Sequence, residues 1–197
     1  IQNVESNGQV FYAKNLLKVY KDGKYGLINL SGKELLACNY TSIEPIKYLS
    51  NSFITEKDGK KGLVDNGGNI IIDNQYSEIE GLTNQYENGY IIKNSDGKYG
   101  LINYNKKQLL ECKYDNIKNV YGSGMYVVKE DGAWEVITAE GEVKLRDKFN
   151  DATSIDNSNI IIKKDQNYSV MSIEGENKLT DYQYLEYSFD GNYIAQK

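Results

Sequence analysis

Short apolar runs alternate with polar turn residues along the whole chain. The runs are rich in β-branched and aromatic residues and span about four residues, which is too short for a stable helix and typical of β-strands. Asp-Gly pairs follow several of them, and both residues tolerate the positive φ of a two-residue type I′ hairpin turn. The pattern predicts short antiparallel strands joined by tight turns. The runs occupy residues 17–20, 53–56, 90–93, 126–129 and 160–163.

These strands and turns form an internal repeat. The segment from Asp22 to Ile28, Asp-Gly-Lys-Tyr-Gly-Leu-Ile, returns twice with little change and twice in a more divergent form. Its second glycine position falls at residues 26, 62, 100, 135 and 169, in steps of 34 to 38 residues. A landmark aromatic keeps nearly the same steps, which predicts five tandem units. The landmark residues are Tyr40, Tyr76, Tyr114, Phe149 and Tyr184.

Each unit contains more than one hairpin. A second turn, such as Ser31-Gly32, follows the motif glycine and precedes a third strand, and the landmark aromatic starts a fourth, weaker strand or a turn. The central strand carries adjacent apolar residues such as Leu27 and Ile28, which face opposite sides of a sheet. Because both sides need cover, the units must stack on one another. The predicted fold class is all-β, with five tandem repeats of about 35 residues and three to four short antiparallel strands in each.

Stacked sheets can close into a ring, as in a β-propeller, or form an open β-solenoid or superhelix. The propeller-like ring is slightly favoured, because residues 191–197 resemble the first strand of a sixth unit and could complete the first sheet. We expect residues 1–16 to be an N-terminal lead-in and residues 17–197 to be a single repeat domain. Its units span about residues 17–52, 53–89, 90–125, 126–159 and 160–192, with a terminal strand at 193–197.

At these residues the chain resembles the WG-repeat (KWG) proteins. The signature is Lys-Tyr-Gly-Leu-Ile-Asn at residues 24–29, with close copies at 60–65 and 98–103. Trp134 occupies the tryptophan position of the family, whereas the next residue, glycine in the family, is Glu135. The resemblance implies a β-repeat domain, common in bacteria and often found on secreted or lipid-anchored surface proteins, so we expect an extracytoplasmic location. The family has no agreed catalytic residues, so none is transferred.

Composition excludes several functions. The chain has 23 basic and 28 acidic residues, a net charge of −5, unlike a basic nucleic-acid-binding protein. It has no histidine, which excludes Ser-His-Asp machinery and His-ligated metal sites. No apolar run is long enough to span a membrane. We expect no cofactor, no metal and no nucleic-acid partner, and we expect Cys38 and Cys112 to be free, partly buried thiols because a whole unit separates them.

The motif glycines are expected at close backbone approaches, since no phosphate-binding loop pattern surrounds them. Carboxylates are the plausible catalytic groups. Acidic residues recur two positions after the landmark aromatic, and in a ring a pair of them could act as a glycosidase does. The residues at this position are Ser42, Glu78, Asn116, Asp151 and Glu186.

Tyrosines are the better candidates for binding. Tyr48, Tyr86 and Tyr121 fall in the loop before the first strand of the next unit, where they can contact a sugar or protein surface or cap the sheet ends. Trp134 and the sole arginine, Arg146, lie in the most divergent unit, where they either belong to a specialised binding surface or serve in ordinary packing. The predicted function is a non-catalytic binding or scaffolding module for a protein or glycan. The alternatives are a carbohydrate-active enzyme with two carboxylates and a structural surface spacer; the oligomeric state is not predicted.

Overall fold

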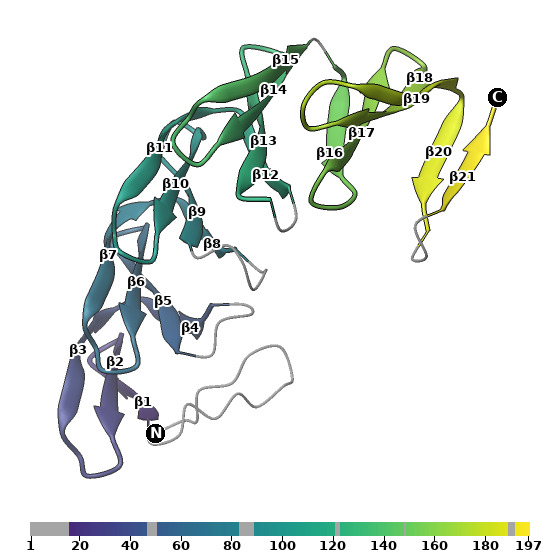
Figure 1. The fold of residues 1–197 in the computed structure, drawn as a ribbon. Coiled ribbons are helices and arrows are strands. Elements are labelled where there is room, and N and C mark those ends of the chain that lie inside the picture. Colours follow the sequence, from purple (N-terminus) through teal and green to yellow (C-terminus); the bar gives the residue numbers. More distant parts are fainter. Residues whose placement is uncertain (1–15, 47–50, 83–88, 121–122, 148, 189–191) are drawn as a thin grey trace. The chain divides into compact units, whose positions relative to one another are not determined.

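The computed structural model describes residues 16–46, 51–82, 89–120, 123–147, 149–188 and 192–197. All regular elements within these ranges are β-strands, as predicted, and neighbouring strands of each sheet follow one another along the chain (Figure 1). The sheets are numbered 1 to 6 in chain order. Sheet 1 contains β1 (Leu16–Lys21), β2 (Lys24–Asn29) and β3 (Glu34–Tyr40); sheet 2 contains β4 (Ser42–Pro45), β5 (Ser52–Lys57), β6 (Lys60–Asp65) and β7 (Ile70–Tyr76).

Sheets 3 and 4 are also four-stranded. Sheet 3 contains β8 (Glu78–Gly81), β9 (Gly89–Lys93), β10 (Tyr99–Asn103) and β11 (Gln108–Tyr114); sheet 4 contains β12 (Asn116–Val120), β13 (Met125–Glu130), β14 (Ala133–Thr138) and β15 (Val143–Asp147).

Sheet 5 repeats this order and sheet 6 is a two-stranded hairpin. Sheet 5 contains β16 (Asp151–Ser154), β17 (Asn159–Lys164), β18 (Asn167–Ser172) and β19 (Asn177–Tyr182); sheet 6 contains β20 (Tyr184–Tyr187) and β21 (Tyr193–Gln196). The four strand positions of a complete sheet are named A to D in chain order. Sheet 1 has B, C and D within the described residues, and sheet 6 has A and B.

Strand A of each sheet comes from the preceding sequence unit. The expected weak strand after Tyr40 does form, but it pairs with β5: Ser42 lies opposite Glu56, and the amide of Thr41 donates a 2.8 Å hydrogen bond to the Glu56 carbonyl. A sheet is therefore offset from a sequence unit, with the boundary at the landmark aromatic. The expected first strand of a sixth unit is present as β21, which pairs with β20.

The B–C hairpins follow their turn residues. Lys21 pairs with Lys24 in sheet 1, and the intervening Asp22 and Gly23 have φ of 51° and 79°, which confirms the predicted type I′ turn. Sheets 2 and 4 repeat this geometry at their Asp-Gly pairs. The prediction is wrong for sheet 3, where one added residue contributes to a longer connection from Asn94 to Lys98.

The C–D turns have one geometry in all five sheets. In sheet 1 the amide of Gly32 donates to the Asn29 carbonyl at 3.0 Å, and Gly32 has a φ of 82°. The Asn29 side-chain oxygen accepts hydrogen bonds from the amides of Ser31 and Lys33 and so caps the turn. The polar residue that follows the apolar pair therefore has a structural role. Its equivalents are Asp65, Asn103, Thr138 and Ser172.

The apolar pair of each C strand connects successive sheets. Leu27 of sheet 1 and Val64 of sheet 2 share one hydrophobic core, and Val136 of sheet 4 and Met171 of sheet 5 share another. The first residue of a pair thus faces the following sheet and the second faces the preceding one. The predicted stacking is confirmed.

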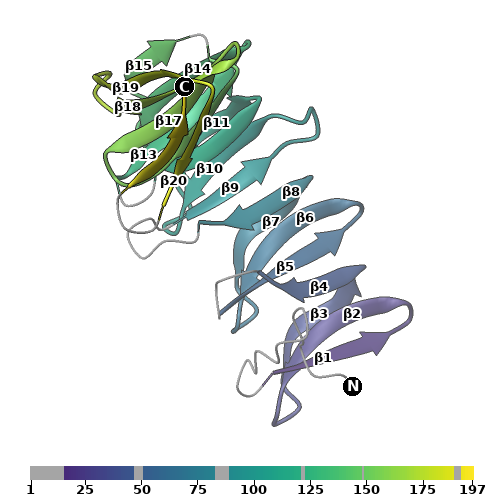
Figure 2. The ribbon, with the colours of Figure 1, turned by 90° about the vertical axis from the view of Figure 1, so that its right-hand side faces the viewer.

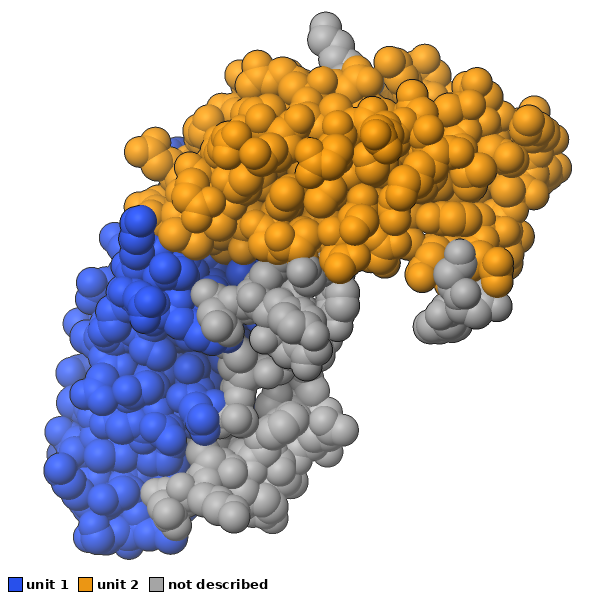
Figure 3. Space-filling view, viewed as in Figure 1, with its two compact units in different colours: residues 1–83, 89–97, 102–107 blue, residues 84–88, 98–101, 108–197 orange. Residues whose placement is uncertain are grey.

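The chain divides into two compact units (Figure 3). Unit 1 comprises residues 1–83, 89–97 and 102–107, and unit 2 comprises residues 84–88, 98–101 and 108–197.

Candidate functional site

The motif glycines lie at close approaches between strands C and D, as predicted. A Cβ on Gly62 would lie 2.7 Å from the Ile72 carbonyl oxygen and 2.9 Å from the Asn74 amide nitrogen. Gly26 and Gly100 are just as close to strand D, at 2.5 and 2.7 Å from the corresponding carbonyl oxygens. Real Cβ atoms do not tolerate such distances to backbone, so only glycine fits without moving the strand.

The close approach is part of a wide bulge in strand D. Lys61 lies opposite Tyr76 and Leu63 opposite Ile72, so two steps on β6 match four steps on β7. The two additional residues fold over Gly62, and the Asn74 side chain donates hydrogen bonds to the carbonyls of Thr55 (2.9 Å) and Lys60 (3.0 Å). Sheet 1 has the same count between β2 and β3. Such bulges re-aim side chains and end strand pairing.

Sheet 4 has a different register because its glycine position holds Glu135. Trp134 lies opposite Asp147, Glu135 opposite Arg146 and Val136 opposite Leu145, so β15 has no additional residue beside Glu135; its register shifts only later, between Val136 and Ile137. The Glu135 side chain, with 4% exposure, forms a 2.6 Å ion pair from its Oε1 to Nη2 of Arg146, whose side chain is 64% exposed. With glutamate at this position, strand D lies beside strand C in ordinary antiparallel register.

Sheet 5 is intermediate between sheets 2 and 4 in the size of its bulge, and its register changes the assignment of one landmark aromatic residue. Tyr168 lies opposite Tyr182 and Val170 opposite Leu179, so β19 has one additional residue beside Ser169. Tyr182 therefore takes the place that Tyr76 has in sheet 2. The landmark assignment of Tyr184 is wrong: this residue belongs to strand A of sheet 6 and is 45% exposed.

Trp134 lies in the core between sheets 4 and 5. It is 4% exposed and packs with Phe149, Ala152 and Ile162, and its indole nitrogen has no hydrogen-bond partner among the described residues. Two ammonium groups lie near the ring, Lys118 at 5.0 Å and Lys129 at 5.8 Å from its centroid. Such cation–π contacts stabilise the indole ring in its buried position.

The structure does not bring Trp134 and Arg146 together. Neighbouring residues of a strand face opposite sides of the sheet, so Trp134 and Glu135 point to different sides. Arg146 is paired with Glu135 and therefore lies on the side away from the indole. These two residues do not form one site.

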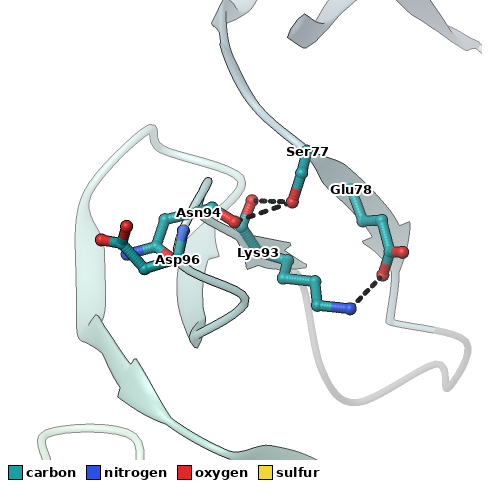
Figure 4. Close-up of polar contacts among 5 residues, drawn as sticks. All are labelled: Ser77, Glu78, Lys93, Asn94 and Asp96. Atoms are coloured by element: carbon teal, nitrogen blue, oxygen red, sulfur yellow. Dashed lines mark hydrogen bonds and ion pairs between the residues drawn. The ribbon is translucent and has the colours of Figure 1, made fainter.

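The carboxylates two positions after the landmark are engaged in contacts with other side chains. Glu78 forms a 3.3 Å ion pair with Lys93 across strands A and B of sheet 3 (Figure 4). Beside it the Ser77 hydroxyl donates to the carbonyls of Lys93 (3.1 Å) and Asn94 (2.8 Å), where the longer B–C connection begins. Asp151 accepts a 2.8 Å hydrogen bond from Lys118. Glu78 thus links two paired strands of sheet 3, whereas Asp151 links strand A of sheet 5 to strand A of sheet 4.

In sheet 6, Glu186 accepts a hydrogen bond from the Tyr184 hydroxyl, which is the main cause of the raised pKa of Tyr184. Among the described residues, no three Cys, Asp or Glu side chains are grouped so that they could hold a metal ion. Within the described ranges, neither Cys38 nor Cys112 forms a disulfide, and both are partly buried. The described part of the chain contains no helix with the length and apolarity needed to cross a membrane.

The predicted binding tyrosines, Tyr48, Tyr86 and Tyr121, lie outside the described residues. The strands on either side of their loops are described. Strands A and B pair up to the loop in each case: Pro45 lies opposite Phe53 in sheet 2, and Gly81 opposite Tyr90 in sheet 3. In sheet 4 Val120 lies opposite Met125. Each A–B loop thus leaves its sheet at the end where the C–D turn also lies, opposite the B–C hairpin (Figure 2).

The pattern of the family described as "WG containing repeat" matches residues 25–60 and 99–134. The chain contains WG repeats in these two segments. The matches start at the aromatic residue of the motif, Tyr25 in the first and Tyr99 in the second, and each is about one sequence repeat long. Comparison with curated protein sequences gives no match.

Solved structures resemble this chain to different degrees. A chain of the eukaryotic initiation factor shares the fold: it aligns with a TM-score of 0.55 and 9% identity over 85% of the present chain, which spans 52% of that chain. The WD40 β-propeller domain of Doa1 aligns with a TM-score of 0.44 and 13% identity, over 92% of this chain and 72% of that one. BamB from Moraxella catarrhalis aligns with a TM-score of 0.46 and 10% identity, over 92% of this chain and 66% of that one.

Repeated sheets of this propeller-like kind are typical of binding or scaffolding modules, and neither the repeat family nor the fold is characteristically catalytic. Sequence reasoning missed the Glu135–Arg146 pair. Its signal was present: the sole arginine stands eleven residues after the only glutamate at a motif-glycine position.

Proposed function

We propose that this chain is a non-catalytic binding module that presents its A–B loops to a protein or glycan partner. The observation that supports it is the register of the A–B hairpins, which starts each loop at the same end of its own sheet. Every one of these loops in sheets 2, 3 and 4 carries a tyrosine: Tyr48, Tyr86 or Tyr121. A tyrosine repeated from sheet to sheet suits the recognition of a flat sugar or an extended peptide.

The carboxylate contacts favour binding over hydrolysis. A glycosidase needs one carboxylic acid and one free carboxylate at the scissile bond. Glu78 and Asp151 instead neutralise Lys93 and Lys118, and these pairs fix strand A to its neighbours. An extracytoplasmic location stays a prediction of the family resemblance.

A triple substitution of the loop tyrosines tests the proposal. The Tyr48/Tyr86/Tyr121→Ala variant and the wild-type chain are applied to a glycan array and to pull-downs from matched extracts. A matched control replaces the exposed Tyr20 and Tyr184 by Ala, since these lie away from the A–B loops. We expect a partner that the wild type and the control retain and the triple variant loses by at least tenfold.

Two results would overturn the proposal. Equal retention of the partner by the triple variant would show that the A–B loops do not bind it. Turnover of model glycosides that is lost in Glu78→Gln or Asp151→Asn would establish the enzyme in place of the binding module, and a chain that binds nothing in either assay would support the structural spacer.

A further inference from the structure

The C–D turns contact strand D of the preceding sheet and so form a row along each compact unit. In unit 1 the ammonium group of Lys106 donates a 2.6 Å hydrogen bond to the Ile70 carbonyl, and Gly68 lies directly against Leu35, where a Cβ would be 2.2 Å from the carbonyl oxygen. In unit 2, Gly141 and Gly175 contact the equivalent strands. Row 1 is defined as the C–D turns of unit 1 (residues 29–33, 65–69 and 103–107) together with the first residue of each D strand that follows. Row 2 is defined in the same way for the turns of unit 2 (residues 138–142 and 172–176).

Row 1 exposes three large apolar side chains and row 2 exposes one. Leu30 is 64% exposed, Ile70 49% and Tyr104 36% in row 1, and Val143 is 44% exposed in row 2. Isolated exposed apolar residues are ordinary, but those of row 1 recur at the same turn of successive sheets, which are spaced about 10 Å apart when stacked. A repeated apolar edge of this kind fits another protein surface.

The two rows differ in charge. Row 1 carries Lys33, Lys106 and Lys107 against Glu34 and Asp65, and the Asp65 carboxylate is occupied in capping its own turn. Row 2 carries four exposed glutamates and no basic residue within its turns. These are Glu140, Glu142, Glu174 and Glu176.

The same asymmetry extends over the units. Unit 1 has 12 basic and 11 acidic residues, a net charge of +1, and unit 2 has 11 basic and 17 acidic residues, a net charge of −6. Beside row 2, the hydrogen bond that Lys144 donates to Glu142 raises the pKa of Lys144, and the negative field of Glu174 adds to the effect. Row 2 is therefore acidic, with four carboxylates, and row 1 carries a small positive excess of three lysines over two carboxylates.

We propose that the chain associates with a second copy of itself, row 1 of one copy docking on row 2 of the other. The exposed apolar residues supply the contact area, and the opposite charges select the unlike pairing while they repel row 1 from row 1 and row 2 from row 2. A contact between unlike surfaces is heterologous, so it either closes into a ring of copies or continues as a chain of them. This proposal does not depend on the A–B loop tyrosines.

Charge reversal of each row separates this contact from a general charge effect. One variant reverses row 1 (Lys33→Glu with Lys107→Glu), and another reverses row 2 (Glu140→Lys, Glu174→Lys and Glu176→Lys). Lys106 and Glu142 are left unchanged because they bond to Ile70 and Lys144. The control for the row 1 variant is Lys21→Glu with Lys57→Glu, which makes the same change in net charge as that variant but beside the exposed B–C hairpins.

Molar mass is measured by light scattering and by sedimentation velocity at about 0.05 and 0.5 M salt, across which electrostatic attraction weakens strongly. We expect the wild type and the control to self-associate at low salt, and each row variant alone to be monomeric. An equimolar mixture of the two row variants should associate again, because the reversed row 1 of one then meets the reversed row 2 of the other.

A wild-type chain that stays monomeric at low salt and high concentration would overturn the proposal. So would a control that loses association as fully as the row 1 variant, or a mixture that fails to recover it. Circular dichroism of each variant confirms that the strands are intact, so that a monomer is not mistaken for an unfolded chain.

Discussion

Sheets 2 and 4 have the same strand order but differ in register at the motif position. In sheet 2, Gly62 lets strand D bulge by two residues, and Lys61 comes to lie opposite Tyr76. In sheet 4, Glu135 holds strand D in ordinary register, and Arg146 comes to lie opposite it. The bulge thus varies with the residue at this position: strand D has two additional residues beside Gly62, one beside Ser169 and none beside Glu135. The repeat tolerates these registers because the stacking core, formed by the apolar pair of strand C, is the same.

The largest effect is expected from a side chain at the glycine position of sheet 2. Gly62→Ala would place a Cβ 2.7 Å from the Ile72 carbonyl, so strand D must move, and we expect a loss of about 2 to 4 kcal/mol in the free energy of unfolding. Urea unfolding measures it. Gly59→Ala in the same sheet is the control: its Cβ would have open space, and the positive φ alone should cost about 1 kcal/mol. Equal losses in the two variants would show that the close approach is unimportant.

The second effect concerns the ion pair that replaces the bulge. Arg146→Ala leaves the buried Glu135 carboxylate without its partner, and we expect a loss of about 1 to 3 kcal/mol. Removing the charge as well, in Arg146→Ala with Glu135→Gln, should recover part of it, because no unpaired charge then stays buried. A double-mutant cycle by urea unfolding measures the coupling. Strict additivity of the two single losses would contradict the pairing.

Lys118 connects sheets 4 and 5 and offers a smaller test. Its ammonium group donates to Asp151 at 2.8 Å and to the Ala152 carbonyl at 2.9 Å, and it lies over the Trp134 ring. Lys118→Met keeps the aliphatic stem and removes these contacts, so we expect a loss of about 1 kcal/mol and a changed emission of Trp134, the sole tryptophan. Lys164→Met, more distant from its partner Asp147 at 3.7 Å, should change neither. An unchanged emission in Lys118→Met would contradict the placement of the ring.

The smallest effect is a pH dependence that separates sheet 2 from sheets 1 and 3. Partial burial alone would raise the pKa of Asp65, but hydrogen bonds from Asn69 and Gly67 prevail and lower it below 3.8. A carboxyl group with a lowered pKa stabilises the fold above its ordinary pKa, and this stabilisation is lost as the pH falls through the lowered value.

Asp65→Asn tests this dependence with a control that the chain itself provides, since asparagine caps the same turn at Asn29 and Asn103. We expect the variant to unfold at nearly the wild-type urea concentration at pH 7 and to lose less stability than the wild type between pH 5 and 2. Asp65→Ala should cost about 1 kcal/mol at pH 7. Identical acid sensitivity of the wild type and Asp65→Asn would contradict the cap.

Much of this fold could be predicted from sequence because it is locally encoded. The strands, the stacking and the need for glycine at residues 26, 62 and 100 follow from residue types and spacing. The offset of strand A could not be predicted, since nothing in Ser42–Pro45 says whether it pairs backwards or forwards along the chain. The landmark at Tyr184 was misassigned for a related reason: aromatic spacing does not reveal how many residues a bulge absorbs.

The candidate site was less predictable. Trp134 is a candidate because it lies in the most divergent unit, but its neighbours Ala152 and Ile162 come from the next sheet, and only the stacking brings them together. The role of Arg146 depends on the register of β14 and β15, which Glu135 itself sets. Long-range pairing of this kind leaves little trace in a single sequence.

Interstrand Hα–Hα nuclear Overhauser effects in the labelled wild-type protein and in Glu135→Gly measure the registers directly. For the wild type we predict cross-peaks that place Trp134 opposite Asp147 in sheet 4 and Lys61 opposite Tyr76 in sheet 2. In Glu135→Gly, the Trp134–Asp147 contact should give way to one with Phe149, as strand D gains the two-residue bulge. A register in β15 that is unchanged by glycine, or one identical in sheets 2 and 4 of the wild type, would contradict the account.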